Sequence, residues 1–67
     1  MLIELKTALL GSGKSQYEVA RLAGMSETRL SRIVTGRAEA TKEEQRILAS
    51  VLGVTVRRVF PKGGRDD

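Results

Sequence analysis

Residues 16–36, which read QYEVARLAGMSETRLSRIVTG, constrain the fold of this chain most strongly because they hold two helical patterns on either side of a glycine. Ser15 and Glu18 form an S-x-x-E capping box, which predicts the start of the first helix. Gly24 ends that helix, since glycine adopts the left-handed conformation that a Cβ disfavours, and Ser26 is placed to cap the second. The inward face of the first helix is expected to hold Val19, Ala20 and Ala23, followed by Met25 after the corner.

The second helix separates its apolar side chains from its polar ones. At about 100° per residue, the inward side carries Leu30, Ile33 and Val34. The outward side carries Thr28, Ser31, Arg32 and Thr35, flanked by Glu27 and Arg29. Small hydroxyls beside a long cation suit the edges of bases in a DNA major groove. The pattern therefore predicts a helix-turn-helix at about residues 16–35, with helix 27–35 as the part that reads DNA.

A further helical pattern lies before this unit. Leu2, Leu5 and Leu9 recur at i, i+3 and i+7 and predict a short first helix whose apolar stripe covers the two central helices. We expect Gly11 and Gly13 to end it.

Two more patterns follow the unit. Thr41 and Glu44 form a second capping box for a helix that Gly53 ends. Thr55 is placed to cap a last short helix, and Pro61 blocks its continuation. The core faces of these helices are expected to comprise Ile47, Leu48, Val51 and Leu52 in the first and Val56, Val59 and Phe60 in the second.

The length of 67 residues allows one small domain. Five helical patterns without period-two alternation predict an all-α, compact five-helix bundle. We expect residues 1–60 to form this domain and residues 61–67, which are polar and glycine-containing, to form a flexible C-terminal tail.

Composition narrows the possible functions. The chain has no Cys and no His, which excludes disulfides, thiolate nucleophiles, imidazole catalysis and zinc sites with soft ligands. Lys and Arg number 12 against 8 Asp and Glu, and the net charge of +4 favours a polyanionic partner. The run MLIELKTALL is interrupted by Glu4 and Lys6, well short of a membrane span, and no leader pattern precedes it, so we expect a cytoplasmic protein.

The string GSGKS at residues 11–15 invites comparison with a phosphate-binding loop. That loop requires a glycine where this chain has Ala8, and it also requires a preceding strand and a βαβ unit. Glu43 and Glu44 likewise fit the first turn of a helix better than a catalytic pair of carboxylates. The sequence therefore predicts no enzyme, no metal and no cofactor.

The central unit resembles the helix-turn-helix of the phage repressor and Cro family, known as the XRE type. The family's characteristic positions are occupied here by Gln16, Ala20, Gly24, Met25, Leu30 and Ile33. The similarity continues through Gly36 and Arg37, the segment TKEEQRILASVLG and the segment VTVRRVFP, and covers about residues 1–60. One departure is Val34 followed by Thr35, where the family more often has Glu followed by Asn.

The resemblance implies a lambda-repressor-like domain that binds double-stranded DNA sequence-specifically and regulates transcription, as a repressor. It also implies a homodimer, with the last helix at the twofold axis. Because the length allows only this one domain, we expect no small-molecule effector. An alternative is an antitoxin or adaptor of the same fold, whose main partner is a toxin or another protein.

The candidate site residues fall into two sets. Base-reading residues are expected to be Glu27, Thr28, Ser31 and Arg32, the last through two hydrogen bonds to guanine. Phosphate-contacting residues are expected to be Gln16, Ser26, Arg29, Thr35 and Arg37. Three of these have open alternatives: Glu27 and Ser26 both suit the start of a helix, and Arg29 faces either a phosphate or the carboxylates of Glu43 and Glu44.

Overall fold

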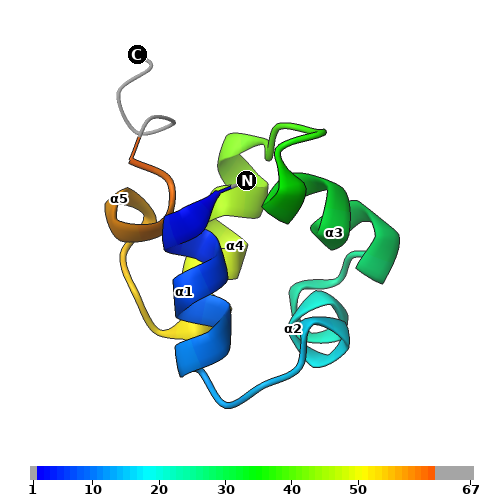
Figure 1. Cartoon of the computed structure of the whole chain (residues 1–67), viewed down its shortest axis with the longest axis horizontal. Helices are drawn as coiled ribbons and strands as arrows, with labels where there is room; N and C mark the ends of the chain where they lie inside the picture. The colour runs from blue at the N-terminus through cyan, green and yellow to red at the C-terminus, as the bar shows by residue number, and fades with distance from the viewer. Residues whose placement is uncertain (1, 62–67) are drawn as a thin grey trace.

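Five helices follow one another in the computed structural model, which describes residues 2–61 (Figure 1). They are α1 (Ile3–Gly11), α2 (Gln16–Ala23), α3 (Glu27–Thr35), α4 (Lys42–Leu52) and α5 (Val56–Val59). The described residues contain no strand, which confirms the predicted all-α class and the five-helix count. The expected flexible tail, residues 61–67, lies outside the described residues except for Pro61.

The core is a single apolar cluster to which all five helices contribute. α2 packs on α3 and α4, while α1 packs on α5 and α3, so the chain closes around one centre (Figure 1). No polar or charged side chain of the described residues is buried. The largest fully buried side chains are Leu5, Val19, Leu30, Ile33, Leu48 and Val59.

Four helices begin at a hydroxyl residue whose side chain accepts a hydrogen bond from the third amide of the helix. These residues are Ser15, Ser26, Thr41 and Thr55. The capping box is complete at Thr41, where the Glu44 carboxylate also accepts from the Thr41 N–H at 2.9 Å. At Ser15 only the hydroxyl half is formed, so the predicted box with Glu18 is half right.

Three helices end in the same glycine turn. In each, the residue after the glycine donates its N–H to a carbonyl five residues earlier, as Met25 does to Ala20 at 3.0 Å. Met25 and Val54 follow Gly24 and Gly53 and are half-buried against the core, as the sequence predicted for Met25. The third turn places the exposed Arg37 at the equivalent position, after α3.

The end of α1 differs from the expectation. Gly11 belongs to the helix, and Ser12 caps it by donating its hydroxyl to the Leu9 carbonyl at 2.7 Å. Gly13, with φ of 77°, then turns the chain toward α2. α1 therefore includes the glycine that the sequence predicted to stop it and ends directly after it, where the N–H and the hydroxyl of Ser12 both donate to the Leu9 carbonyl.

The buried face of α4 is centred differently from the prediction. Leu48 and Ala49 are buried, whereas Ile47, Val51 and Leu52 are half-buried. α4 is contacted on two sides, by α2 and by α5, so a small residue beside Leu48 is covered while the wider apolar stripe stays partly open.

Candidate nucleic-acid interface

α2 and α3 meet at a corner fixed by backbone hydrogen bonds. Gly24 is left-handed, with φ of 75°, and its N–H donates to the Arg21 carbonyl at 3.1 Å. Ser26, two residues after the glycine, is extended and accepts from the Arg29 N–H at 3.0 Å, so α3 starts at the next residue, Glu27. Because α2 begins at Gln16 and α3 ends at Thr35, the predicted helix-turn-helix at residues 16–35 has the right bounds.

α3 buries one side and exposes the other. Leu30, Ile33 and Val34 are at most 3% exposed and hold the helix on the core. On the outward side, Glu27, Thr28 and Arg32 are exposed and Ser31 is half-buried. Within the described part of the chain, the side chains of Thr28, Ser31 and Arg32 form no hydrogen bond, so their donors and acceptors are available to a ligand.

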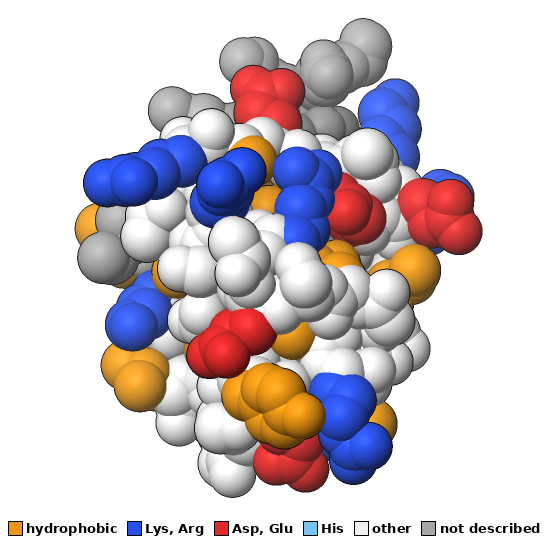
Figure 2. All heavy atoms as spheres, turned by 90° about the vertical axis from the view of Figure 1, so that its right-hand side faces the viewer, with side chains coloured by type: hydrophobic (Ala, Val, Ile, Leu, Met, Phe, Trp, Pro, Cys, Tyr) orange, Lys and Arg blue, Asp and Glu red, His pale blue; other side chains and the backbone are white. Residues whose placement is uncertain are grey.

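Charge on this face is mixed. In Figure 2, which views the side formed by α2 and α3, several Lys and Arg side chains gather across the upper part of the face, with carboxylates between and below them. Arg32 and Arg37 are both exposed, and the Arg37 N–H donates to the Arg32 carbonyl at 2.8 Å. The last turn of α3 thus fixes the backbone of two cations at the same end of the helix.

The expected phosphate-contacting residues differ in their exposure and in the hydrogen bonds that they already form. Gln16 opens α2 and is half-buried, and Arg37 is exposed. The Ser26 hydroxyl accepts from its own helix, which leaves its proton free to donate outward. The Thr35 hydroxyl instead donates to the Ser31 carbonyl at 2.9 Å, so a phosphate would have to replace that bond.

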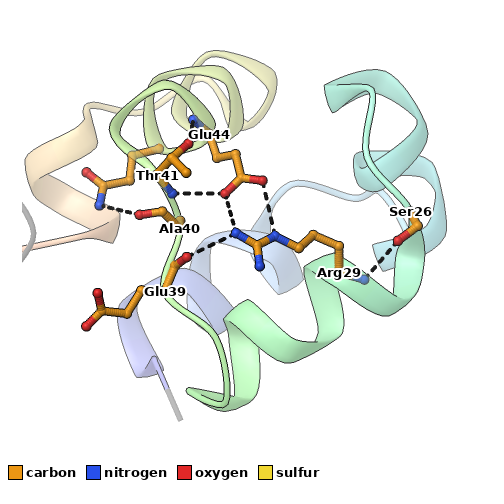
Figure 3. Close-up of polar contacts among 7 residues, drawn as sticks. Ser26, Arg29, Glu39, Ala40, Thr41 and Glu44 are labelled. Atoms are coloured by element: carbon orange, nitrogen blue, oxygen red, sulfur yellow. Dashed lines mark hydrogen bonds and ion pairs between the residues drawn. The ribbon is translucent and has the colours of Figure 1, made fainter.

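Arg29 faces α4 and not the outward side of α3 (Figure 3). Its Nε donates to Glu44 Oε2 at 3.1 Å and its Nη2 to Glu44 Oε1 at 2.8 Å. The same Nη2 also donates to the Glu39 carbonyl at 3.1 Å. Of the two carboxylates that the sequence left open, Glu44 and not Glu43 is the partner.

The contact shifts both ionisable groups. The hydrogen bond to Glu44 raises the pKa of Arg29. The hydrogen bond from Arg29, followed by that from the Thr41 backbone, lowers the pKa of Glu44 below its ordinary value of 4.5. Both groups are therefore charged at neutral pH. The position of Glu44 at the third residue of α4 indicated the pair in the sequence. No sequence pattern indicated the hydrogen bond from Arg29 to the Glu39 carbonyl.

The described residues contain neither a membrane-spanning helix nor a cluster of metal ligands. Among them is no helix with the length and hydrophobicity of a membrane span. His, Cys, Asp and Glu residues among them form no group placed to hold a metal ion.

Comparison with known proteins gives a family match that covers most of the helical bundle. The family model described as helix-turn-helix matches residues 5–59, which spans the interval from α1 through α5. Comparisons with curated proteins and with solved structures give no match. The matched interval includes the corner at Gly24 and the outward side of α3 described above. The chain therefore belongs to the XRE-type helix-turn-helix family and is a DNA-binding protein of the transcription-regulator kind.

Proposed function

We propose that this protein is a sequence-specific repressor that inserts α3 into the DNA major groove as a homodimer. The observation that carries the proposal is the outward side of α3, where Thr28, Ser31 and Arg32 have no partner within the described residues while the opposite side is locked in the core. Residues 1–60 act as the DNA-binding domain and residues 61–67 as its tail, in the cytoplasm and without a cofactor.

Each outward side chain has a role set by its chemistry. The Arg32 guanidinium donates two parallel hydrogen bonds to O6 and N7 of guanine, which discriminate by about 1 to 3 kcal/mol. Thr28 and Ser31 contact base edges or the thymine methyl group. Glu27 stands at the positive end of α3, and in the groove it accepts a hydrogen bond from the amino group of cytosine. This contact adds selectivity but not affinity, because the carboxylate repels the phosphates.

Phosphate contacts hold the two helices over the groove. Arg37 is exposed at the end of α3 and neutralises a phosphate, while Gln16 and the free proton of Ser26 donate to phosphates at the start of α2 and α3. Thr35 joins them by exchanging its internal hydrogen bond for one to a phosphate oxygen. These contacts set register and affinity but carry no sequence information.

Dimerisation pairs two copies of α3 about 34 Å apart on a pseudo-palindromic site. Val59 and Phe60 are at most 5% exposed, so they belong to the core of their own subunit. Val56 is half-buried, and Arg57 and Arg58 are exposed, which leaves these three residues of α5 for the interface. Repression follows from occupancy of a promoter.

A second candidate function is an adaptor or antitoxin that binds a protein. It is favoured by two apolar side chains on the outer side of α1, Ile3 at 67% and Leu10 at 74% exposed, which no described residue covers. The salt dependence of DNA binding discriminates between the two functions. A dimer with about six to ten phosphate contacts loses affinity with a log–log slope of about −5 to −9, whereas an adaptor shows no such specific binding.

The decisive experiment is selection of bound duplexes from a random pool with the purified protein. Enrichment of two half-sites at one fixed spacing supports both the sequence preference and the dimer. Recovery of unrelated sequences would refute the proposed function.

Two variants then test the roles of the cations on the selected duplex. Arg32→Ala should weaken binding where the site contains the guanine, with little effect once that base is changed. Arg37→Ala should weaken binding to all sequences alike. Uniform loss in both variants would refute the assignment of Arg32 to a base.

A further inference from the structure

The contact of Arg29 with α4 joins three parts of the chain that are separate in sequence. We define the Arg29 junction as Arg29, Glu39, Thr41 and Glu44 (Figure 3). Arg29 lies in the first turn of α3, Glu39 in the connecting loop, and Thr41 and Glu44 at the start of α4. Five hydrogen bonds of 2.8 to 3.1 Å connect them.

We propose that Arg29 is a positioning residue, which sets the orientation of α3 for base reading through Glu44, and not a phosphate ligand. This inference rests on the proposed function, because it assigns Arg29 a part in reading DNA without touching it.

The packing of the helices supports this role. α3 packs on α2 and on α1, but α4 is not among the helices that it contacts extensively. The Arg29 junction therefore supplies a direct tie between α3 and α4. The Arg29 N–H also donates to Ser26, the N-cap of the reading helix, and its guanidinium donates to Glu44, whose carboxylate accepts from Thr41, the N-cap of α4.

The shape of the guanidinium supports it as well. Two donors of Arg29 meet the two oxygens of Glu44 in a fork, and one of them also reaches the Glu39 carbonyl. A planar fork fixes direction as well as distance, which a lysine ammonium cannot reproduce. Glu44 is held in turn by the Thr41 N–H, so the acceptor does not swing freely.

The charge of the pair argues against a phosphate ligand. Glu44 neutralises Arg29 at 2.8 Å, and the two side chains are only 35% and 23% exposed. A neutralised cation displaces no counterion from DNA, whereas each new phosphate contact contributes about −0.9 to the salt slope. Arg29 is thus expected to leave that slope unchanged.

The test uses the full chain with two probes: the duplex selected by the wild-type protein and a scrambled duplex of equal length and composition. Arg29→Gln, Glu44→Gln and the double variant are titrated with both probes at several salt concentrations. Gln at position 44 keeps a carbonyl oxygen for the Thr41 N–H, so the capping box persists. Glu43→Gln is the matched control, since it removes the same charge from an exposed neighbour in the same turn of α4.

The measured quantity is the ratio of affinities for the selected and scrambled duplexes. Loss of folded protein lowers both affinities by one factor, so a merely structural role does not change this ratio. We expect each single variant to lower it by roughly two- to thirtyfold, the range for changes within coupled networks, and the double variant to lower it no further. Glu43→Gln should leave it unchanged, and Arg29→Gln should keep the wild-type salt slope.

Different failures separate the two proposals. If selection enriches no duplex, the proposed function fails and this inference falls with it. If a duplex is enriched but Arg29→Gln weakens both probes equally and makes the slope shallower by about 1.8, which is about 0.9 for each of the two copies of Arg29 in a dimer, Arg29 is a phosphate ligand and only this inference is overturned. An unchanged ratio in both single variants, or additive losses in the double variant, overturns it in the same way.

Discussion

Replacement of Gly24 by alanine isolates the cost of the backbone conformation at the corner between α2 and α3. Gly24 has φ of 75°, in the left-handed region. A Cβ added at this position meets no atom within 4 Å, so Gly24→Ala introduces no clash. The effect of the substitution is therefore conformational.

The magnitude follows from two opposed contributions. The left-handed conformation costs an L-residue about 1 to 2 kcal/mol. The smaller conformational freedom of alanine in the unfolded chain offsets about 0.4 to 1 kcal/mol of this. We expect Gly24→Ala to lower the free energy of unfolding by about 1 kcal/mol, which for a domain of this size lowers Tm by about 4 to 8 °C.

Gly11 provides the matched control. It is the last residue of α1, its φ is not positive, and an added Cβ again meets nothing within 4 Å. Since glycine within a helix is less stable than alanine by about 0.5 to 1 kcal/mol, Gly11→Ala should raise Tm by a few degrees, about 2 to 5 °C.

Thermal unfolding followed by circular dichroism, together with urea titration, measures both changes. The reasoning is refuted if both variants shift stability in the same direction. It is also refuted if Gly24→Ala costs more than about 3 kcal/mol, because the conformational contributions cannot reach that value.

Three further predictions concern stability. Hydrogen bonds from Arg29 and Thr41 lower the pKa of Glu44 below 4.5 in the folded protein. The charge of Glu44 therefore contributes fully to the free energy of unfolding above pH 4.5, and this contribution is lost as the pH falls through the pKa of the folded state. The Tm difference between wild type and Glu44→Gln should stay constant from about pH 7 to about pH 5 and shrink in more acidic buffer. A difference that widens in acidic buffer would contradict the lowered pKa of Glu44. Thr41→Ala removes the acceptor of the Glu44 N–H and should cost about 1 kcal/mol in urea titration, while Thr41→Ser retains it; equal losses would argue against the cap. Leu30→Ala empties a fully buried position and should cost about 2.7 to 5 kcal/mol, comparable to the whole stability of a core this small, so a cooperative unfolding transition near that of the wild type would contradict the packing.

The helices could be predicted from the sequence because their ends are encoded locally. Hydroxyl residues at Ser15, Ser26 and Thr41 and glycines at Gly24 and Gly53 each act within one turn of their own position, and all five lie where they were expected. The inward face of α3 was equally predictable, since one helical period separates it from the outward side.

Features that depend on contacts between distant segments were harder to predict from the sequence. The ion pair of Arg29 with Glu44 depends on how α4 returns beside α3, which no local pattern encodes. The burial of Ala49 likewise depends on α2 and α5 covering α4 from two sides. The inclusion of Gly11 in α1 was not predictable from the glycine alone, because the cap is the next residue, Ser12, whose N–H and hydroxyl both donate to the Leu9 carbonyl. The roles of the outward residues of α3 in reading DNA remain predictions.

The glycine turn that ends α2, α3 and α4 is one local structure used for two purposes. Its hydrogen bonds involve only backbone atoms, so the side chain that follows the glycine is not needed to form it. After α2 and α4 that side chain anchors the turn to the interior, whereas after α3 it is Arg37, which points into solvent. Position 37 can therefore vary in charge and length without disturbing the helix before it. If Arg37 contacts a phosphate as proposed, the strength of DNA attachment can be adjusted at this position independently of the architecture.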